Sequence, residues 1–131
     1  MPVARDIMTP AVISVQPEDH INDAMDLLLA NRISGIPVIE ENGKLVGIIS
    51  EADRLKLFKE GTDIKKARVC DYMTSDVITV DEEASLEEIA DRLTTSGIRR
   101  VPVLHDGDVV GIISRRDMLL TLSIINQRRR G

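Results

Sequence analysis

The apolar positions of the chain form a pattern that occurs twice. Leu45–Ile49 and Val109–Ile113 are continuous apolar stretches, each with a glycine at its third position. Such stretches, rich in β-branched residues, are typical of strands covered on both faces. Because a serine at the end of a strand can accept the free N–H groups of a following helix, each copy predicts a buried strand that runs into a helix. The residues that follow are Ser50 and Asp53 in the first copy, and Ser114 and Asp117 in the second.

The surrounding positions repeat as well, at an almost constant offset. Alternating apolar residues predict a short strand at 12–15 and another, 65 residues later, at 77–80. Acidic residues follow each strand, as is common where a helix begins. Apolar residues at helical spacing then predict two amphipathic helices, with Ile21, Ala24, Met25 and Leu28 on one and Leu86, Ile89, Ala90 and Leu93 on the other.

Each copy continues with a bend that leads into a proline-containing strand, at 33–39 and at 98–104. Glycine-containing turns then join these strands to the apolar stretches as hairpins. The turns are at 41–43 and 105–107, and the closing helices run from Asp53 to about Lys59 and from Asp117 to about Asn126.

The order strand, helix, strand, strand, helix therefore occurs twice, which predicts an α/β (α+β) fold built from two β-α-β-β-α repeats. We expect the repeats at residues 1–60 and 61–131, with Gly61–Asp63 as the loosest point between them. Two copies are too few for a solenoid, so we expect them to face each other with pseudo-two-fold symmetry and to share a core.

The pattern Ser-x-x-Asp has two interpretations. It is first of all a helix cap, because aspartate is also favourable in the first turn. The start of a helix additionally attracts anions, and a carboxylate can accept two hydrogen bonds from a diol. Phosphate and sugar side by side would indicate a nucleotide.

The composition and net charge argue against several classes of function. The chain has 131 residues, of which 43% are hydrophobic and 30% are charged, as in soluble globular domains. No apolar run approaches the roughly 20 residues that span a bilayer, and the first residues lack the apolar core of a signal peptide, so we expect a cytoplasmic protein without a membrane partner. The net charge of −5 argues against nucleic-acid binding, and we interpret the basic tail Arg128–Arg130 as a solvated end.

Reactive side chains are sparse. The single cysteine, Cys70, has no partner for an internal disulfide, and His20 and His105 lie far from it in the sequence. We therefore expect no metal site and no cofactor. No serine, cysteine or histidine stands beside a plausible base, so we expect no catalytic residue and no enzyme activity.

With these motifs, the two repeats resemble paired CBS domains, the Bateman module named after cystathionine beta-synthase. The resemblance covers roughly residues 3 to 121, and with nothing enzyme-like appended the chain looks like a stand-alone module. The motifs that carry it are Asp-x-Met-Thr at 6–9 and 71–74, Ile-Ser-Gly-Ile-Pro-Val at 33–38, Gly-Ile-Arg-Arg-Val-Pro-Val at 97–103, and Gly-Ile-Ile-Ser-x-x-Asp at 47–53 and 111–117.

The resemblance implies a regulatory module that binds adenosine-containing ligands, such as AMP, ADP, ATP or S-adenosylmethionine, in a cleft between the repeats. The aspartates would take the ribose hydroxyls, the serines would face phosphate or ribose, and Ile33 and Ile98 would line the adenine slot. One site would hold Ile112, Ser114 and Asp117 with Ile13, Ile33, Ser34 and Gly35; the other would hold Ile48, Ser50 and Asp53 with Ile78, Ile98, Arg99 and Arg100.

Four arginines distinguish the second repeat. Arginine suits a phosphate because its donors form a fork, although each of the four could equally be solvated or paired with surface acids. They are Arg99, Arg100, Arg115 and Arg116, and the first repeat has Glu51-Ala52 where the second has Arg115-Arg116. We therefore expect the two sites to differ.

The sequence leaves one alternative to a nucleotide sensor open: a scaffold with empty clefts whose helices only form oligomers. A sensor would also need a regulated partner protein, which the sequence does not name. Exposed apolar stripes mark interfaces, so we expect a homodimer formed through the helices. The residues expected at that interface are Met25, Leu28, Leu29, Ile89 and Leu93, together with the apolar run 118–125.

Overall fold

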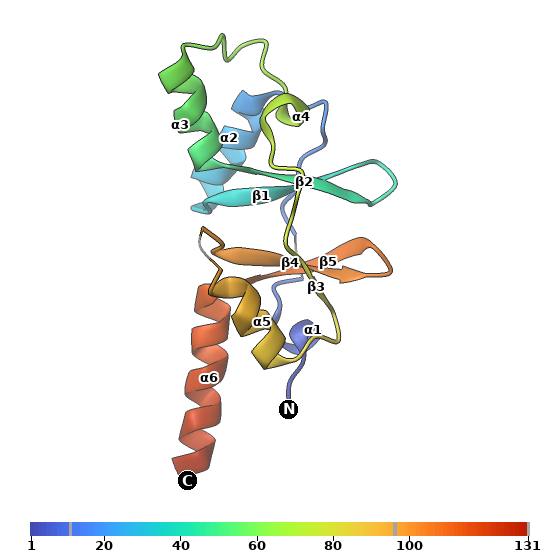
Figure 1. Ribbon diagram of the computed structural model, residues 1–131, viewed down its shortest axis with the longest axis vertical. Helices are drawn as coiled ribbons and strands as arrows, with labels where there is room; N and C mark the ends of the chain where they lie inside the picture. The colour runs from blue at the N-terminus through green and yellow to red at the C-terminus, as the bar shows by residue number, and fades with distance from the viewer. Residues whose placement is uncertain (11, 96, 131) are drawn as a thin grey trace. The chain divides into compact units, whose positions relative to one another are not determined.

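The computed structural model describes residues 1–10, 12–95 and 97–130, with side chains as far as Gln127. The side chains of the basic tail Arg128–Arg130 therefore lie outside the described residues. The elements in chain order are α1 (Ala4–Ile7), α2 (Ile21–Asn31), β1 (Gly35–Ile39), β2 (Leu45–Ser50), α3 (Glu51–Glu60), α4 (Val69–Tyr72), β3 (Val80–Asp81), α5 (Leu86–Leu93), β4 (Arg100–His105), β5 (Asp108–Ser114) and α6 (Arg115–Arg130) (Figure 1).

The fold is mixed α+β and consists of two compact units. Unit 1 contains Met1–Val12 and Ile78–Gly131, and unit 2 contains Ile13–Val77. Each unit has its own buried apolar cluster. Both clusters contain residues from both sequence repeats, such as Ala4 in unit 1 and Val69 in unit 2, and the expectation that the two repeats share one core stays a prediction.

Unit 2 is built on the hairpin of β1 and β2, which the sequence predicted. The strands are antiparallel, with Gly35 opposite Ser50 and Pro37 opposite Ile48. α2 and α3 pack against this hairpin, and their buried residues include Ile21 and Leu57. α3 begins directly after Ser50, as expected, and ends at Gly61, whose φ of 70° is in the left-handed region that favours glycine at this position.

Unit 1 has the same hairpin with one additional short strand. β4 pairs antiparallel with β5, with Arg100 opposite Ser114, and β3 pairs parallel with β4. α5 buries Leu86, Ile89 and Leu93 in the cluster of this unit. α6 begins at Arg115 and continues beyond the expected end at Asn126 to Arg130.

The two short strands expected at 12–15 and 77–80 are much reduced. In unit 2 only Val15 pairs, through one parallel bridge to Val38, and in unit 1 only the two-residue β3 is formed. The Val15 N–H donates to the carbonyl of Pro37 at 3.1 Å, and the Ile39 N–H donates to the carbonyl of Val15 at 2.8 Å. The next bond of a parallel ladder would need the N–H of Pro37, which proline lacks, so the ladder stops there.

The Asp-x-Met-Thr segments are exchanged between the sequence repeats. Thr9, from the start of the chain, exchanges backbone hydrogen bonds of 2.8 and 3.0 Å with Ile112 on β5. Thr74 exchanges two bonds of 2.9 Å with Ile48 on β2. Ala4 is fully buried in the cluster of unit 1. The first segment therefore completes a unit whose other residues come from the second repeat.

The methionine of each Asp-x-Met-Thr segment explains why each apolar stretch contains a glycine. A β-carbon at Gly47 would lie 2.6 Å from Met73 Sδ, and one at Gly111 would lie 2.7 Å from Met8 Cγ. Only a residue without a β-carbon leaves room for the methionine at these distances.

Among the described residues, no helix is both long and apolar enough to cross a bilayer.

Candidate functional site

The start of α3 combines a helix cap with a carboxylate. The Ser50 N–H donates to Asp53 Oδ2 at 2.8 Å, and the Ser50 hydroxyl donates to the same oxygen at 3.1 Å. Ser50 has an extended backbone, with φ −136° and ψ 169°, as expected for the residue before the first turn. Both side chains are half-buried. The aspartate thus holds the strand end against the first turn of the helix.

The start of α6 has the reciprocal form of this cap. The Ser114 N–H donates to Asp117 Oδ2 at 2.8 Å, and the Asp117 N–H donates to Ser114 Oγ at 3.1 Å. This is a capping box, in which each side chain satisfies the backbone of the other residue. The cap interpretation of Ser-x-x-Asp is therefore confirmed in both copies.

The cap uses only one oxygen of each carboxylate. The cap bonds go to Oδ2 of each aspartate, so the cap itself does not require Oδ1. A carboxylate accepts through both oxygens, so each aspartate can hold its cap and still accept from the hydroxyl group of a ligand. The structural interpretation and the binding interpretation are therefore compatible.

The bend before each proline-containing strand lies beside the helix start of the same repeat. The Glu51 N–H donates to the carbonyl of Ser34 at 3.0 Å, and the Arg115 N–H donates to the carbonyl of Arg99 at 3.1 Å. The structure thus places Ser34 and Gly35 next to Ser50 in unit 2, and Arg99 and Arg100 next to Ser114 in unit 1. The grouping that the resemblance implies, of residues from both repeats, stays a prediction.

The candidate isoleucines contribute to their own units. They are half-buried, and Ile13 and Ile33 pack against the cluster of unit 2, whereas Ile78 and Ile98 pack against that of unit 1. Ile48 and Ile112 form the backbone pairs with Thr74 and Thr9. Packing and pairing are the roles that the structure assigns to these six residues.

The four arginines have unequal roles. The Nε–H of Arg115 donates to the carbonyl of Leu93, the last residue of α5, at 3.1 Å. A cation at the C-terminal end of a helix is favourable because unpaired carbonyls gather there. Arg115 is therefore at least in part a structural residue of unit 1. Arg99 and Arg116 are exposed, and Arg100 is half-buried.

Reactive groups outside these helix starts are few. The described ranges contain no group of three or more histidine, cysteine, aspartate or glutamate side chains arranged to hold a metal ion. Desolvation and the adjacent carboxylate of Asp71 raise the pKa of the Cys70 thiol, which disfavours the nucleophilic thiolate at neutral pH.

The duplicated unit with its capped Ser-x-x-Asp helix start is characteristic of one class of repeat protein, and comparison with known proteins gives the family. The chain belongs to the CBS domain family, whose model matches residues 4–60 and 69–124. This confirms the resemblance seen in the sequence.

Several relatives share this module. The crystal structure of CBSX2 in complex with AMP has a TM-score of 0.86 and 32% identity, over 96% of this chain and 99% of that chain; CBSX2 is a CBS-pair protein from Arabidopsis thaliana. The CBS domain pair of protein MJ0100, in complex with 5′-methylthioadenosine and S-adenosyl-L-methionine, has a TM-score of 0.82 and 29% identity, over 94% of this chain and 97% of that chain.

A curated relative, the protein MJ1225 of Methanocaldococcus jannaschii, is 30% identical over 118 residues, which is 90% of this chain and 42% of that protein. The next two relatives, an inosine-5′-monophosphate dehydrogenase and a zinc metalloprotease of the same organism, are matched over 23% and 32% of their lengths. The chain thus spans less than half the length of these three proteins.

Proposed function

We propose that the protein is a regulatory module that binds an adenosine-containing ligand, of the class of AMP, ADP, ATP or S-adenosylmethionine, at its Ser-x-x-Asp helix starts. The observation that carries this proposal is that the cap at Asp53 and at Asp117 uses Oδ2 of the carboxylate and does not require Oδ1. The neighbours crystallised with AMP, 5′-methylthioadenosine and S-adenosyl-L-methionine support it.

In this proposal the chain's residues bind and orient the ligand and perform no chemistry on it. Each aspartate accepts hydrogen bonds from the ribose hydroxyls through Oδ1. The cap fixes the carboxylate beforehand, so little side-chain entropy is lost on binding. A phosphate is attracted by the helix start and by nearby arginine side chains. A regulated partner protein and a cytoplasmic location stay predictions.

The test is a thermal-unfolding screen with AMP, ADP, ATP, S-adenosylmethionine and NAD. A ligand at one hundred times its Kd stabilises the folded state by about 2.7 kcal/mol. We expect a rise in Tm with at least one of them, and a smaller rise for Asp53→Ala or Asp117→Ala. No rise with any ligand would favour the alternative, an oligomeric scaffold without a nucleotide.

The aspartate variants need a control because they also remove a helix cap. Ser85→Ala provides it: the Ser85 hydroxyl accepts from the Glu88 N–H at 3.2 Å and caps α5. Its loss costs about 1 kcal/mol, as for other caps, so it lowers the Tm of the free protein comparably. The rise in Tm caused by the ligand should remain complete in Ser85→Ala.

We further propose that the Asp117 helix start binds the ligand more tightly than the Asp53 helix start. Arg116 is exposed beside Asp117, whereas Glu51 is exposed beside Asp53 and repels a phosphate. A charge-assisted hydrogen bond contributes roughly 1.5–3 kcal/mol, so one additional arginine can change Kd ten-fold or more. Calorimetry on the two alanine variants tests this. Loss of the tight phase in Asp53→Ala alone would reverse the ranking.

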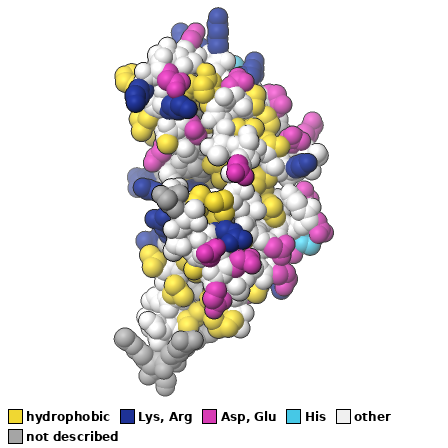
Figure 2. All heavy atoms as spheres, in the orientation of Figure 1, with side chains coloured by type: hydrophobic (Ala, Val, Ile, Leu, Met, Phe, Trp, Pro, Cys, Tyr) yellow, Lys and Arg dark blue, Asp and Glu magenta, His cyan; other side chains and the backbone are white. Residues whose placement is uncertain are grey.

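We also propose a homodimer, formed through α3 and through α6, which carries the apolar run 118–125 expected from the sequence, rather than through the other residues expected there. Of those, Leu28, Ile89 and Leu93 are buried inside their own units. The exposed apolar side chains instead include Leu55 and Phe58 on α3 and, 64 positions later, Leu119 and Leu122 on α6. Figure 2 shows hydrophobic side chains on the surface over both helices.

A further inference from the structure

A histidine in unit 1 lies between two carboxylates from different segments of the chain. His105 Nδ1 is 2.6 Å from Glu82 Oε1, and His105 Nε2 is 3.4 Å from Asp106 Oδ2. A neutral imidazole carries one N–H and would turn a lone pair toward the other carboxylate. Only the imidazolium carries N–H groups on both nitrogens, so the geometry fits the protonated form.

The contact joins two loops of unit 1. Glu82 follows β3 and precedes α5, whereas His105 ends β4 at the turn into β5. A backbone hydrogen bond joins the same two segments: the Glu82 N–H donates to the carbonyl of Leu104 at 2.9 Å. Figure 2 shows acidic side chains gathered over these two segments. The His105 imidazolium places a positive charge among these acidic side chains.

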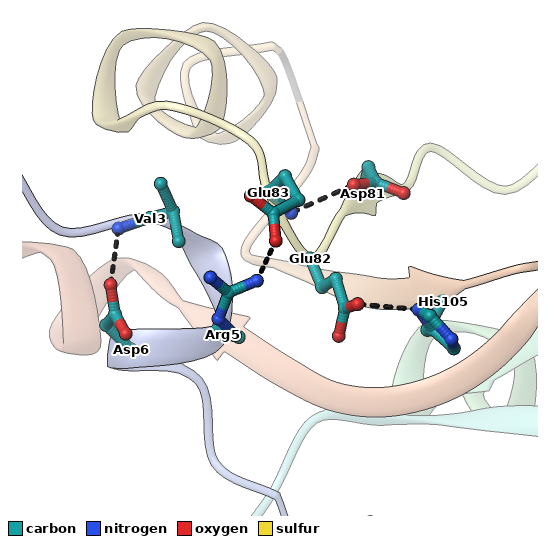
Figure 3. A network of polar contacts seen from close by, with 7 residues as sticks. All are labelled: Val3, Arg5, Asp6, Asp81, Glu82, Glu83 and His105. Atoms are coloured by element: carbon teal, nitrogen blue, oxygen red, sulfur yellow. Dashed lines mark hydrogen bonds and ion pairs between the residues drawn. The ribbon is translucent and has the colours of Figure 1, made fainter.

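The loop that carries Glu82 also anchors the start of the chain. The Arg5 N–H donates to the carbonyl of Glu82 at 2.9 Å, and the Ala4 N–H donates to the carbonyl of Ala84 at 3.0 Å. Arg5 also forms an ion pair with Glu83. Figure 3 shows that the neighbouring residues Glu82 and Glu83 of this loop make two side-chain contacts, Glu82 with His105 and Glu83 with Arg5.

We propose that His105 is a proton-controlled clasp, whose imidazolium fixes the loop after β3 and thereby the docking of the N-terminal segment (residues 1–10) on unit 1. The N-terminal segment carries Met8 and Thr9, which contact Gly111 and Ile112 on β5. Protonation of one exposed imidazole would in this way stabilise a segment that pairs with Ile112, two residues before Ser114 of the α6 cap.

The charges around His105 set the direction of the effect. The hydrogen bond and charge of Glu82, followed by the charges of Asp106 and Asp81, raise the pKa of His105. Asp108, opposite His105 in the β4–β5 register, adds a further negative charge. Because the pKa is raised in the folded state, the clasp stabilises unit 1 below the ordinary histidine pKa of about 6.5 and is lost as pH rises through the raised value.

Unit 2 lacks the clasp, although it has the same hairpin. The position that matches His105, 65 residues earlier, is Glu40, and the position that matches Glu82 is Pro17. These residues line an open crevice of about 400 Å³, together with Gln16, Glu18, Glu41 and Asn42. Glu40 and Pro17 cannot form a contact that depends on protonation of a base, so unit 2 serves as a comparison within the same chain.

Two NMR measurements on the full chain test the proposal. The first is the imidazole titration of His105 in the parent protein and in Glu82→Gln, which keeps the shape of the side chain but removes its charge. We expect the pKa of His105 to fall in the variant, because the charge that raises it is removed. An unchanged His105 titration would overturn the proposal.

The second measurement is the hydrogen-exchange protection of the Ala4, Arg5 and Thr9 amides as a function of pH, after correction for intrinsic exchange rates. In the parent protein the protection should fall as pH rises through the pKa of His105, and the fall should be lost in His105→Gln. The Ile48 and Thr74 amides of unit 2 are the control. If protection in the N-terminal segment does not depend on His105, the contact is only local and the clasp is refuted.

Discussion

The exchanged packing of the Asp-x-Met-Thr segments can be tested at the glycines beneath them. In Gly111→Ala the new β-carbon would lie 2.7 Å from Met8 Cγ and 3.0 Å from Met8 Cβ. Non-bonded carbon atoms are comfortable at about 3.5–4.0 Å, so Met8 or β5 must move. Gly35→Ala is the matched control, because its β-carbon would have ordinary contacts of 3.5–3.7 Å.

The expected magnitudes come from two opposing effects. Overpacking a filled site costs about 1–3 kcal/mol. Replacing glycine by alanine without strain gains about 0.4–1 kcal/mol, because the unfolded chain loses conformational freedom. We therefore expect Gly111→Ala to lower the free energy of unfolding by about 1–2 kcal/mol and Gly35→Ala to leave it unchanged or to raise it slightly.

The assay is urea unfolding followed by circular dichroism, on the single variants and on Gly111→Ala combined with Met8→Ala. Removing Met8 Cγ and Sδ takes away the closest contacts, so the glycine substitution should cost less in the double variant, with a coupling of roughly 0.5–3 kcal/mol. The rescue should be incomplete here, because alanine keeps Met8 Cβ at 3.0 Å from the new β-carbon; it should also be incomplete for Gly47→Ala with Met73→Ala, because that β-carbon would still lie 2.9 Å from the carbonyl of Thr74. Equal costs of Gly111→Ala and Gly35→Ala, or strict additivity with Met8→Ala, would refute the packing argument.

Two further predictions concern single side chains. Arg115→Ala should lower the free energy of unfolding by about 0.3–1 kcal/mol, since it removes a cation from the end of α5, whereas the exposed Arg116→Ala should not; a larger effect at Arg116 in urea unfolding would contradict the assignment. Phe58→Asp and Leu122→Asp should each convert the proposed dimer into monomers in sedimentation experiments, and the exposed Lys65→Asp should not; a dimer that survives both substitutions uses another surface.

Local patterns in the sequence predicted most of the elements. The apolar stretches that end in Ser50 and Ser114 are strands, and each serine is followed directly by a helix. These predictions succeeded because strand burial, hairpin turns and helix caps depend on residues close together in the chain. The strands predicted at 12–15 and 77–80 are shorter than expected, because their length depends on a proline in the strand beside them, which lies far away in the sequence.

The surface was harder to predict than the helix starts. Leu28 and Leu29 are adjacent on one amphipathic helix, yet one is buried and the other is 78% exposed. Apolar spacing gives the direction of a helical face, but the depth of burial depends on what covers it. The binding of Arg115 to the end of α5 was equally hidden, because its acceptor is a backbone carbonyl 22 residues away.

The exchange of segments changes what a repeat means in this protein. The family matches follow the sequence, at 4–60 and 69–124, so each match contributes residues to both compact units. Met8 lies against the glycine of the second Gly-Ile-Ile-Ser stretch, and Met73 lies against that of the first. Methionine and glycine of one repeat therefore cannot be understood as a contacting pair within that repeat. Each is explained by its counterpart in the other copy, which is why two copies on one chain complete both units.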